Sequence, residues 1–173
     1  MSVLTADSRR DLEIHRYPVL VYAMAPLAAL VLQAWVPRLT GRFSWFDLPL
    51  IVTVYFALGR RSPIQGTVMG CILGLLEDAL THRPIGINGV AKTLVGFLAA
   101  SVGIRIDVEN HTIRLFLIFV LSLLSSALVI FVDRFLLGLP GAPDWLAELY
   151  TAVGNSVIAV LIFPFFDRFQ IRD

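Results

Sequence analysis

Apolar residues gather in six continuous stretches along the chain, separated by short polar or proline-containing segments. These stretches cover residues 17–36, 45–59, 63–80, 85–104, 113–137 and 146–166. Such runs predict helices that cross a hydrocarbon layer about 30 Å thick, and they lack the alternation typical of membrane β-strands. The pattern therefore predicts an all-α integral membrane protein, built as a single bundle of six transmembrane helices. The second and third stretches are short for spanning alone, so we expect them to tilt little, lie inside the bundle or extend into flanking residues.

Composition supports this class. Of the 173 residues, 57% are hydrophobic and 16% are charged, and the mean hydropathy is +0.79. A soluble domain carries about 25% charged residues to cover its core, and a disordered chain has far fewer apolar side chains. Fourteen basic and thirteen acidic residues nearly cancel. Since no run of like charge is present, nucleic acid is not an expected partner.

The first stretch predicts a retained helix, because it is too long for the apolar region of a signal peptide and lacks a cleavage site. We expect residues 1–16 to form a cytoplasmic segment, residues 17–166 a transmembrane domain and residues 167–173 a cytoplasmic tail.

Basic residues set the expected orientation. With the N-terminus inside, the inner segments carry Arg9, Arg10, Arg16, Arg60, Arg61, Arg105, Arg114, Arg168 and Arg172. The outer segments carry Arg38, Arg42, Arg83 and Arg134. The inner excess predicts that both termini are cytoplasmic, and Trp35, Trp45 and Trp145 then fall at the outer interface, as in an aromatic belt.

Small residues recur at helical spacing. Gly66, Gly70 and Gly74 share one face of the third stretch, and Gly89 and Gly96 offer a similar face on the fourth. Because apolar burial drives little helix association in a bilayer, close backbone approach predicts a helix-packing seam here. Ala25 and Ala29 form a comparable stripe on the first stretch, which either packs within the bundle or forms a groove for a partner helix.

Polar residues cluster around the short loop between the third and fourth stretches. Glu77, Asp78, Asn88 and Lys92 should meet near the outer side, because the two helices are expected to be antiparallel neighbours. A lysine inside a membrane helix is costly unless it is paired. We hypothesise an ion pair between Asp78 and Lys92. The cluster is either a structural strut or the wall of a polar pocket for a small molecule or partner.

No residue pattern predicts catalysis or a cofactor. The three histidines, His15, His82 and His111, lie in different flanks, and Cys71 is the only cysteine, so no metal set is expected. The serines of the fifth stretch have no histidine on a shared face to activate them. We therefore expect no catalytic residues, no metal, no cofactor and no enzymatic activity.

The chain resembles the MreD family of bacterial rod shape-determining membrane proteins. The resemblance rests on the glycine-rich third stretch ending in Leu75-Leu76-Glu77-Asp78, followed by Gly86 and Gly89 at the start of the fourth, and covers about residues 19–166. It implies a non-enzymatic scaffold of the elongasome in the bacterial inner membrane, which supports lateral peptidoglycan synthesis and rod shape. It also implies MreC as the direct partner, with RodA, a class B penicillin-binding protein and MreB as indirect partners.

The MreD family is also similar in helix layout to the substrate-binding subunits of energy-coupling-factor transporters. The alternative function is therefore a membrane subunit that binds a vitamin-like solute. It would need an outward-facing cavity, lined here by Trp35 and Trp45 together with the four residues of the polar cluster. A lipid-handling enzyme would be a third class, but it lacks an identifiable nucleophile or metal set.

Overall fold

The computed structural model describes residues 18–40, 46–106, 110–138 and 144–168. Its elements are α1 (Val19–Thr40), α2 (Leu48–Arg60), α3 (Pro63–Leu80), α4 (Ile87–Arg105), α5 (His111–Phe131), the π-helical turn η2 (Val132–Leu136) and α6 (Trp145–Asp167). The described residues contain helices and connections but no strand, which confirms the all-α prediction. The predicted cytoplasmic segment 1–16, Trp45, and residues 169–173 of the predicted tail lie outside the described residues.

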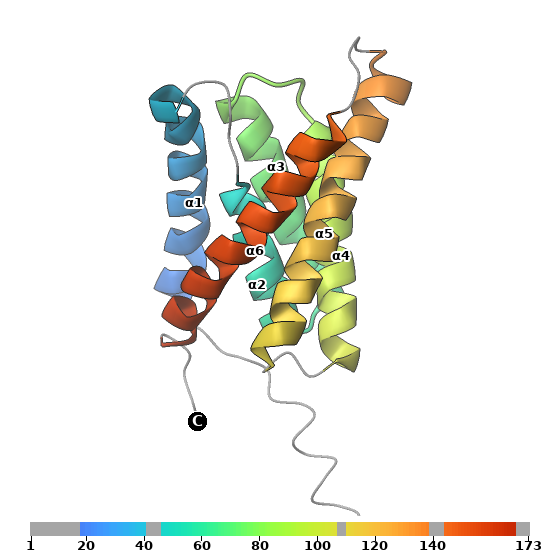
Figure 1. The fold of residues 1–173 in the computed structure, drawn as a ribbon. Coiled ribbons are helices and arrows are strands. Elements are labelled where there is room, and N and C mark those ends of the chain that lie inside the picture. Colours follow the sequence, from blue (N-terminus) through green and yellow to red (C-terminus); the bar gives the residue numbers. More distant parts are fainter. Residues whose placement is uncertain (1–17, 41–45, 107–109, 139–143, 169–173) are drawn as a thin grey trace, which may run out of the picture.

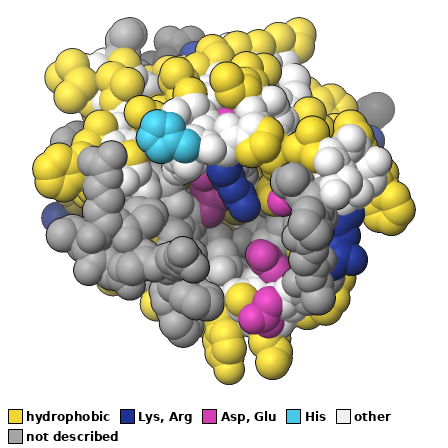
Figure 2. Space-filling model, turned by 90° about the horizontal axis from the view of Figure 1, so that it is seen from above, with side chains coloured by type: hydrophobic (Ala, Val, Ile, Leu, Met, Phe, Trp, Pro, Cys, Tyr) yellow, Lys and Arg dark blue, Asp and Glu magenta, His cyan; other side chains and the backbone are white. Residues whose placement is uncertain are grey.

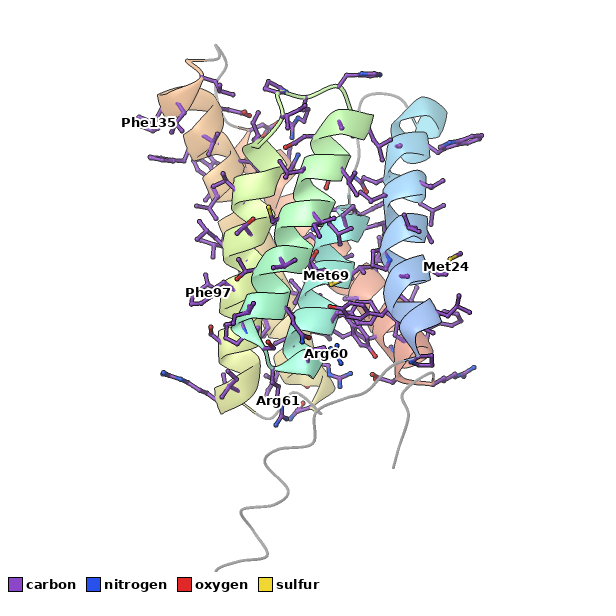
Figure 3. The ribbon with its side chains drawn as sticks, turned by 180° about the vertical axis from the view of Figure 1, so that it is seen from behind. Met24, Arg60, Arg61, Met69, Phe97 and Phe135 are labelled. Carbon is purple, nitrogen blue, oxygen red and sulfur yellow. The ribbon has the colours of Figure 1, made fainter. Side chains whose placement is uncertain are left out.

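Three of these helical stretches are long and apolar enough to cross a membrane: Ile87–Arg105, Thr112–Leu136 and Trp145–Asp167. Two described stretches, Leu20–Trp35 and Leu48–Arg60, are apolar but shorter. Apolar side chains also cover much of the outer surface, as Met24 and Phe97 show by projecting away from the bundle (Figure 3). An apolar exterior of this kind is typical of a protein that contacts lipid.

The helices alternate in direction and form one bundle around α2 (Figure 1). α1 stands at one side, α3 and α4 lie together at the back, and α6 crosses the front diagonally to end beside the start of α1. Arg60 and Arg61 lie at the end of the bundle where α2 meets α3, and Phe135 lies at the opposite end (Figure 3). These are called the lower and upper ends below.

The central helix, α2, is short and enclosed. Its 13 residues span about 20 Å, against about 33 Å for the 22 residues of α1. It therefore occupies only the lower half of the bundle (Figure 1). Every residue from Pro49 to Gly59 is buried, which fits the expectation that the second stretch lies inside the bundle.

Aromatic packing and one ionic contact fix the lower end of α2. The Tyr55 ring lies 4.9 Å from the ring of Phe163 and 5.1 Å from that of Phe166, measured between centroids. The Tyr55 hydroxyl donates a 2.8 Å hydrogen bond to Asp167, which also pairs with Arg114 at 2.8 Å. The end of α6 is thereby tied to both α2 and α5.

The seam between α3 and α4 depends on glycine. A methyl group added at Gly70 would collide with the backbone carbonyl of Lys92, and one at Gly74 with that of Asn88. Gly66 and Gly96 face each other, and a methyl group on either would strike the other's carbonyl oxygen. Gly89 is looser, because its nearest neighbour would be the flexible Leu75 side chain at 2.9 Å. Four of the five predicted packing glycines thus lie at direct backbone approaches.

Substitution of Gly70 by alanine should lower the free energy of unfolding by about 1–3 kcal/mol, because rigid backbone must move apart to admit the methyl group. The measurement is unfolding in mixed detergent micelles, followed by circular dichroism. Val68→Ala is the matched control, since Val68 lies on the exposed face of the same helix. Equal stability of the two variants would contradict a glycine-dependent seam.

Candidate functional site: a buried ion cluster beneath a polar cavity

The site begins where the chain enters α2 inside the bundle. The Asp47 N–H donates to Asn155 Oδ1 at 2.7 Å, and the Leu48 N–H donates to Gln33 Oε1 at 3.2 Å. The Asp47 carboxylate then accepts the Leu50 N–H at 2.9 Å as the N-cap of α2. These part-buried backbone donors have limited access to bulk water, so protein groups satisfy them. Side chains of α1 and α6 therefore satisfy the backbone donors at the internal start of α2.

Lys92 lies at the centre of the site. Its ammonium nitrogen lies 2.7 Å from Asp47 Oδ2 and 2.7 Å from Glu77 Oε2, and its side chain is fully buried. Asn88, one turn earlier on α4, accepts a further hydrogen bond from the ammonium at 3.4 Å. Asp47, Glu77 and Lys92, called the ion triad below, join α2, α3 and α4.

The hypothesised pair between Asp78 and Lys92 is wrong. Among the described residues, the ion-pair partners of Lys92 are Asp47 and Glu77. Asp78 instead accepts the backbone N–H groups of Gly86 at 2.8 Å and Asn88 at 3.1 Å, together with the Asn88 side-chain amide at 2.8 Å. The first turn of α4 lies directly against Asp78, and its donors occupy the Asp78 carboxylate. Lys92 lies one helical turn further along α4 and pairs with other carboxylates. The Asp78 carboxylate is therefore the anion that binds the N-terminus of α4.

The structure brings Glu77, Asp78, Asn88 and Lys92 together, and it adds Asp47, which sequence reasoning missed. Asp47 precedes Lys92 by 45 positions, so spacing along the chain could not connect them. The available signal was Asp47-Leu48-Pro49, an aspartate followed by a proline in the first helical turn, which is a helix-start pattern. That signal predicts the cap but not the ion pair.

A polar cavity of about 440 Å³ adjoins the ion triad. Asp47, Glu77 and Asn88 lie on one side of it, and serines of α5 and residues of α6 lie on the other. From above, charged side chains lie in a hollow near the middle of this face, and hydrophobic side chains lie around its outer edge (Figure 2). Trp35 is not part of the described lining and is 59% exposed on α1, so its predicted place in such a cavity is wrong.

An apolar groove of about 540 Å³ lies elsewhere on the bundle, between α1, α2 and α6. Ala25, Ala28 and Ala29 form part of its α1 side, and Leu161 and Phe165 form part of its α6 side. The stripe predicted from Ala25 and Ala29 therefore faces this groove. Ala29 is nearly buried in the core, so it also serves packing within the bundle.

Within the described ranges, no three histidine, cysteine, aspartate or glutamate side chains are grouped so that they could hold a metal ion. Comparison of the chain with family models, with curated proteins and with solved structures gives no match.

Removal of the central cation should be strongly destabilising. Lys92→Met leaves two buried carboxylates facing each other, and we expect a loss of about 3–5 kcal/mol in the free energy of unfolding. Adding Glu77→Gln and Asp47→Asn removes the unpaired charges and should restore part of that loss. The measurement is again micellar unfolding. The triad assignment fails if Lys92→Met is rescued as well by Asp78→Asn as by the two neutralising changes.

Proposed function

We propose that the chain is a non-enzymatic, multi-pass scaffold of the bacterial inner membrane, with both termini in the cytoplasm and a role of the MreD kind. In this proposal all six helices lie in the membrane. The protein binds the single transmembrane helix of MreC and thereby supports the elongasome, including RodA, a class B penicillin-binding protein and MreB.

The apolar groove is the observation that carries this proposal. On α1 it has small residues at successive turns, Ala25 and then Ala28 and Ala29, between larger apolar ones, and Leu48 and Val52 of α2 also line it. Small side chains let a second helix backbone approach closely, which is the main source of helix association in a bilayer. The described residues that line the groove are all apolar, which suits the binding of a transmembrane helix.

The polar cavity favours one alternative, a substrate-binding membrane subunit of a vitamin-type transporter. Such a subunit needs a recess that holds a polar solute, and about 440 Å³ lies within the usual range for small-molecule sites. The scaffold has priority because the groove and the resemblance point to the same partner chemistry.

Affinity purification of the tagged full chain from its native membrane, in mild detergent, separates the two functions. The scaffold proposal expects recovery of MreC, identified by mass spectrometry, with or without the wall synthases. Recovery of paired ATPase subunits with a bound solute, and no MreC, would overturn it in favour of the transporter.

Filling the groove should weaken partner recovery without loss of the bundle. Ala28→Leu places three extra carbon atoms in the groove from an exposed position on α1. We expect at least a tenfold drop in recovered MreC at an equal amount of inserted protein. Ala23→Leu is the matched control, because Ala23 is exposed on the same helix but does not line the groove. Equal recovery with both variants would count against the groove as the docking site.

A further inference from the structure

The polar cavity carries an uneven balance of charge. Within the ion triad Lys92 lies between two carboxylates, which gives the triad a formal charge of −1, and both carboxylates line the cavity. Glu148 adds a third lining carboxylate, which has no side-chain partner within the described part of the chain. Among the described lining residues, three carboxylates stand against one cation, Arg83, and such an excess of negative charge favours a cationic ligand group.

The position of Lys92 indicates an organic cation in place of a metal ion. Its ammonium already occupies the point 2.7 Å from both Asp47 and Glu77, where a metal ion would otherwise bind the two carboxylates. A ligand must therefore approach from the cavity side and use directional hydrogen bonds. A primary ammonium offers three donors for this purpose.

Ser125 supplies an unused polar group at the same place. Hydroxyls on the helices commonly donate to the carbonyl four residues earlier, as Thr151 does to Ala147 at 3.0 Å and Ser156 does to Ala152 at 2.9 Å. Ser125 lines the cavity and is only 4% exposed, yet its hydroxyl has no hydrogen bond to any described residue. Because the residue is nearly buried and lines the cavity, water or a ligand in the cavity must supply the hydrogen bond that the described residues do not.

Arg83 gives the cavity a basic group at a different depth from the carboxylates. It lines the same cavity but is exposed, whereas the Glu77 side chain is 8% exposed and that of Asp47 is 19% exposed. The carboxylates thus lie deep and the guanidinium lies toward the opening. A guanidinium is well suited to bind a phosphate or carboxylate group.

We propose that the cavity binds a zwitterion with a primary ammonium at one end and an anionic group at the other. The ammonium lies against the Asp47 and Glu77 carboxylates and the Ser125 hydroxyl, Glu148 adds negative charge to the same cavity, and the anionic group contacts Arg83. Phosphoethanolamine has this chemistry, either as a lipid headgroup or in a free compound. The inference concerns the cavity and not the groove, so it is independent of the proposed partner.

The test uses the purified full chain in detergent free of ethanolamine lipid. Glycerophosphoethanolamine should raise the melting temperature at millimolar concentration. Glycerophosphocholine, which lacks N–H donors, and glycerophosphoglycerol, which lacks the cation, should not. Ser125→Ala and Glu148→Gln should each weaken glycerophosphoethanolamine binding about tenfold. Ser101→Ala, at a half-buried serine that bonds its own helix and does not line the cavity, should leave it unchanged.

Reconstitution distinguishes the two sources of the ligand. In phosphatidylglycerol nanodiscs, glycerophosphoethanolamine should bind. If adding phosphatidylethanolamine to the bilayer abolishes this binding, the native ligand is the lipid headgroup, and if binding persists, the ligand is a soluble zwitterion. Equal shifts with all three glycerophospho compounds, no shift with any, or full affinity in Ser125→Ala and Glu148→Gln would each overturn the proposal.

Discussion

The start of α2 inside an apolar bundle imposes the main constraint on this structure. A helix that begins there places backbone N–H groups where access to water is limited, and each unsatisfied group costs free energy comparable to a lost hydrogen bond. Gln33 and Asn155 accept the first of these donors, and the Asp47 carboxylate accepts another. Residues that look misplaced in apolar helices α1 and α6 are therefore the partners that a buried helix start requires.

The cap creates a second requirement, which Lys92 meets. Asp47 brings a negative charge to the interior, and Glu77 brings another, so a cation between them is needed. Lys92 reaches both because Gly70 lets the α4 backbone lie directly against α3 at that level. The glycine seam and the ion triad are thus one arrangement, in which close backbone packing sets the position of the charge.

Polar and apolar features are separated on either side of the α2 N-terminus. Asp47 borders the polar cavity, and the next residue, Leu48, borders the apolar groove. The two surfaces differ in the ligands they suit, a small polar molecule and an apolar helix. Since they share one short helical start, a change in the packing of that turn would alter both surfaces together.

The helical class, the approximate helix positions and the seam glycines can be predicted from the sequence, because these depend on local hydropathy and on spacing within one helix. The sequence also grouped Glu77, Asp78, Asn88 and Lys92, since a short loop forces their helices together. Which of them pair was decided only by the tertiary structure. The α4 N-terminus takes Asp78, and Lys92 pairs with Asp47 from a helix that is distant in sequence. The cavity and the groove likewise arise only where three or more helices meet, and no periodicity within a single helix specifies such a junction.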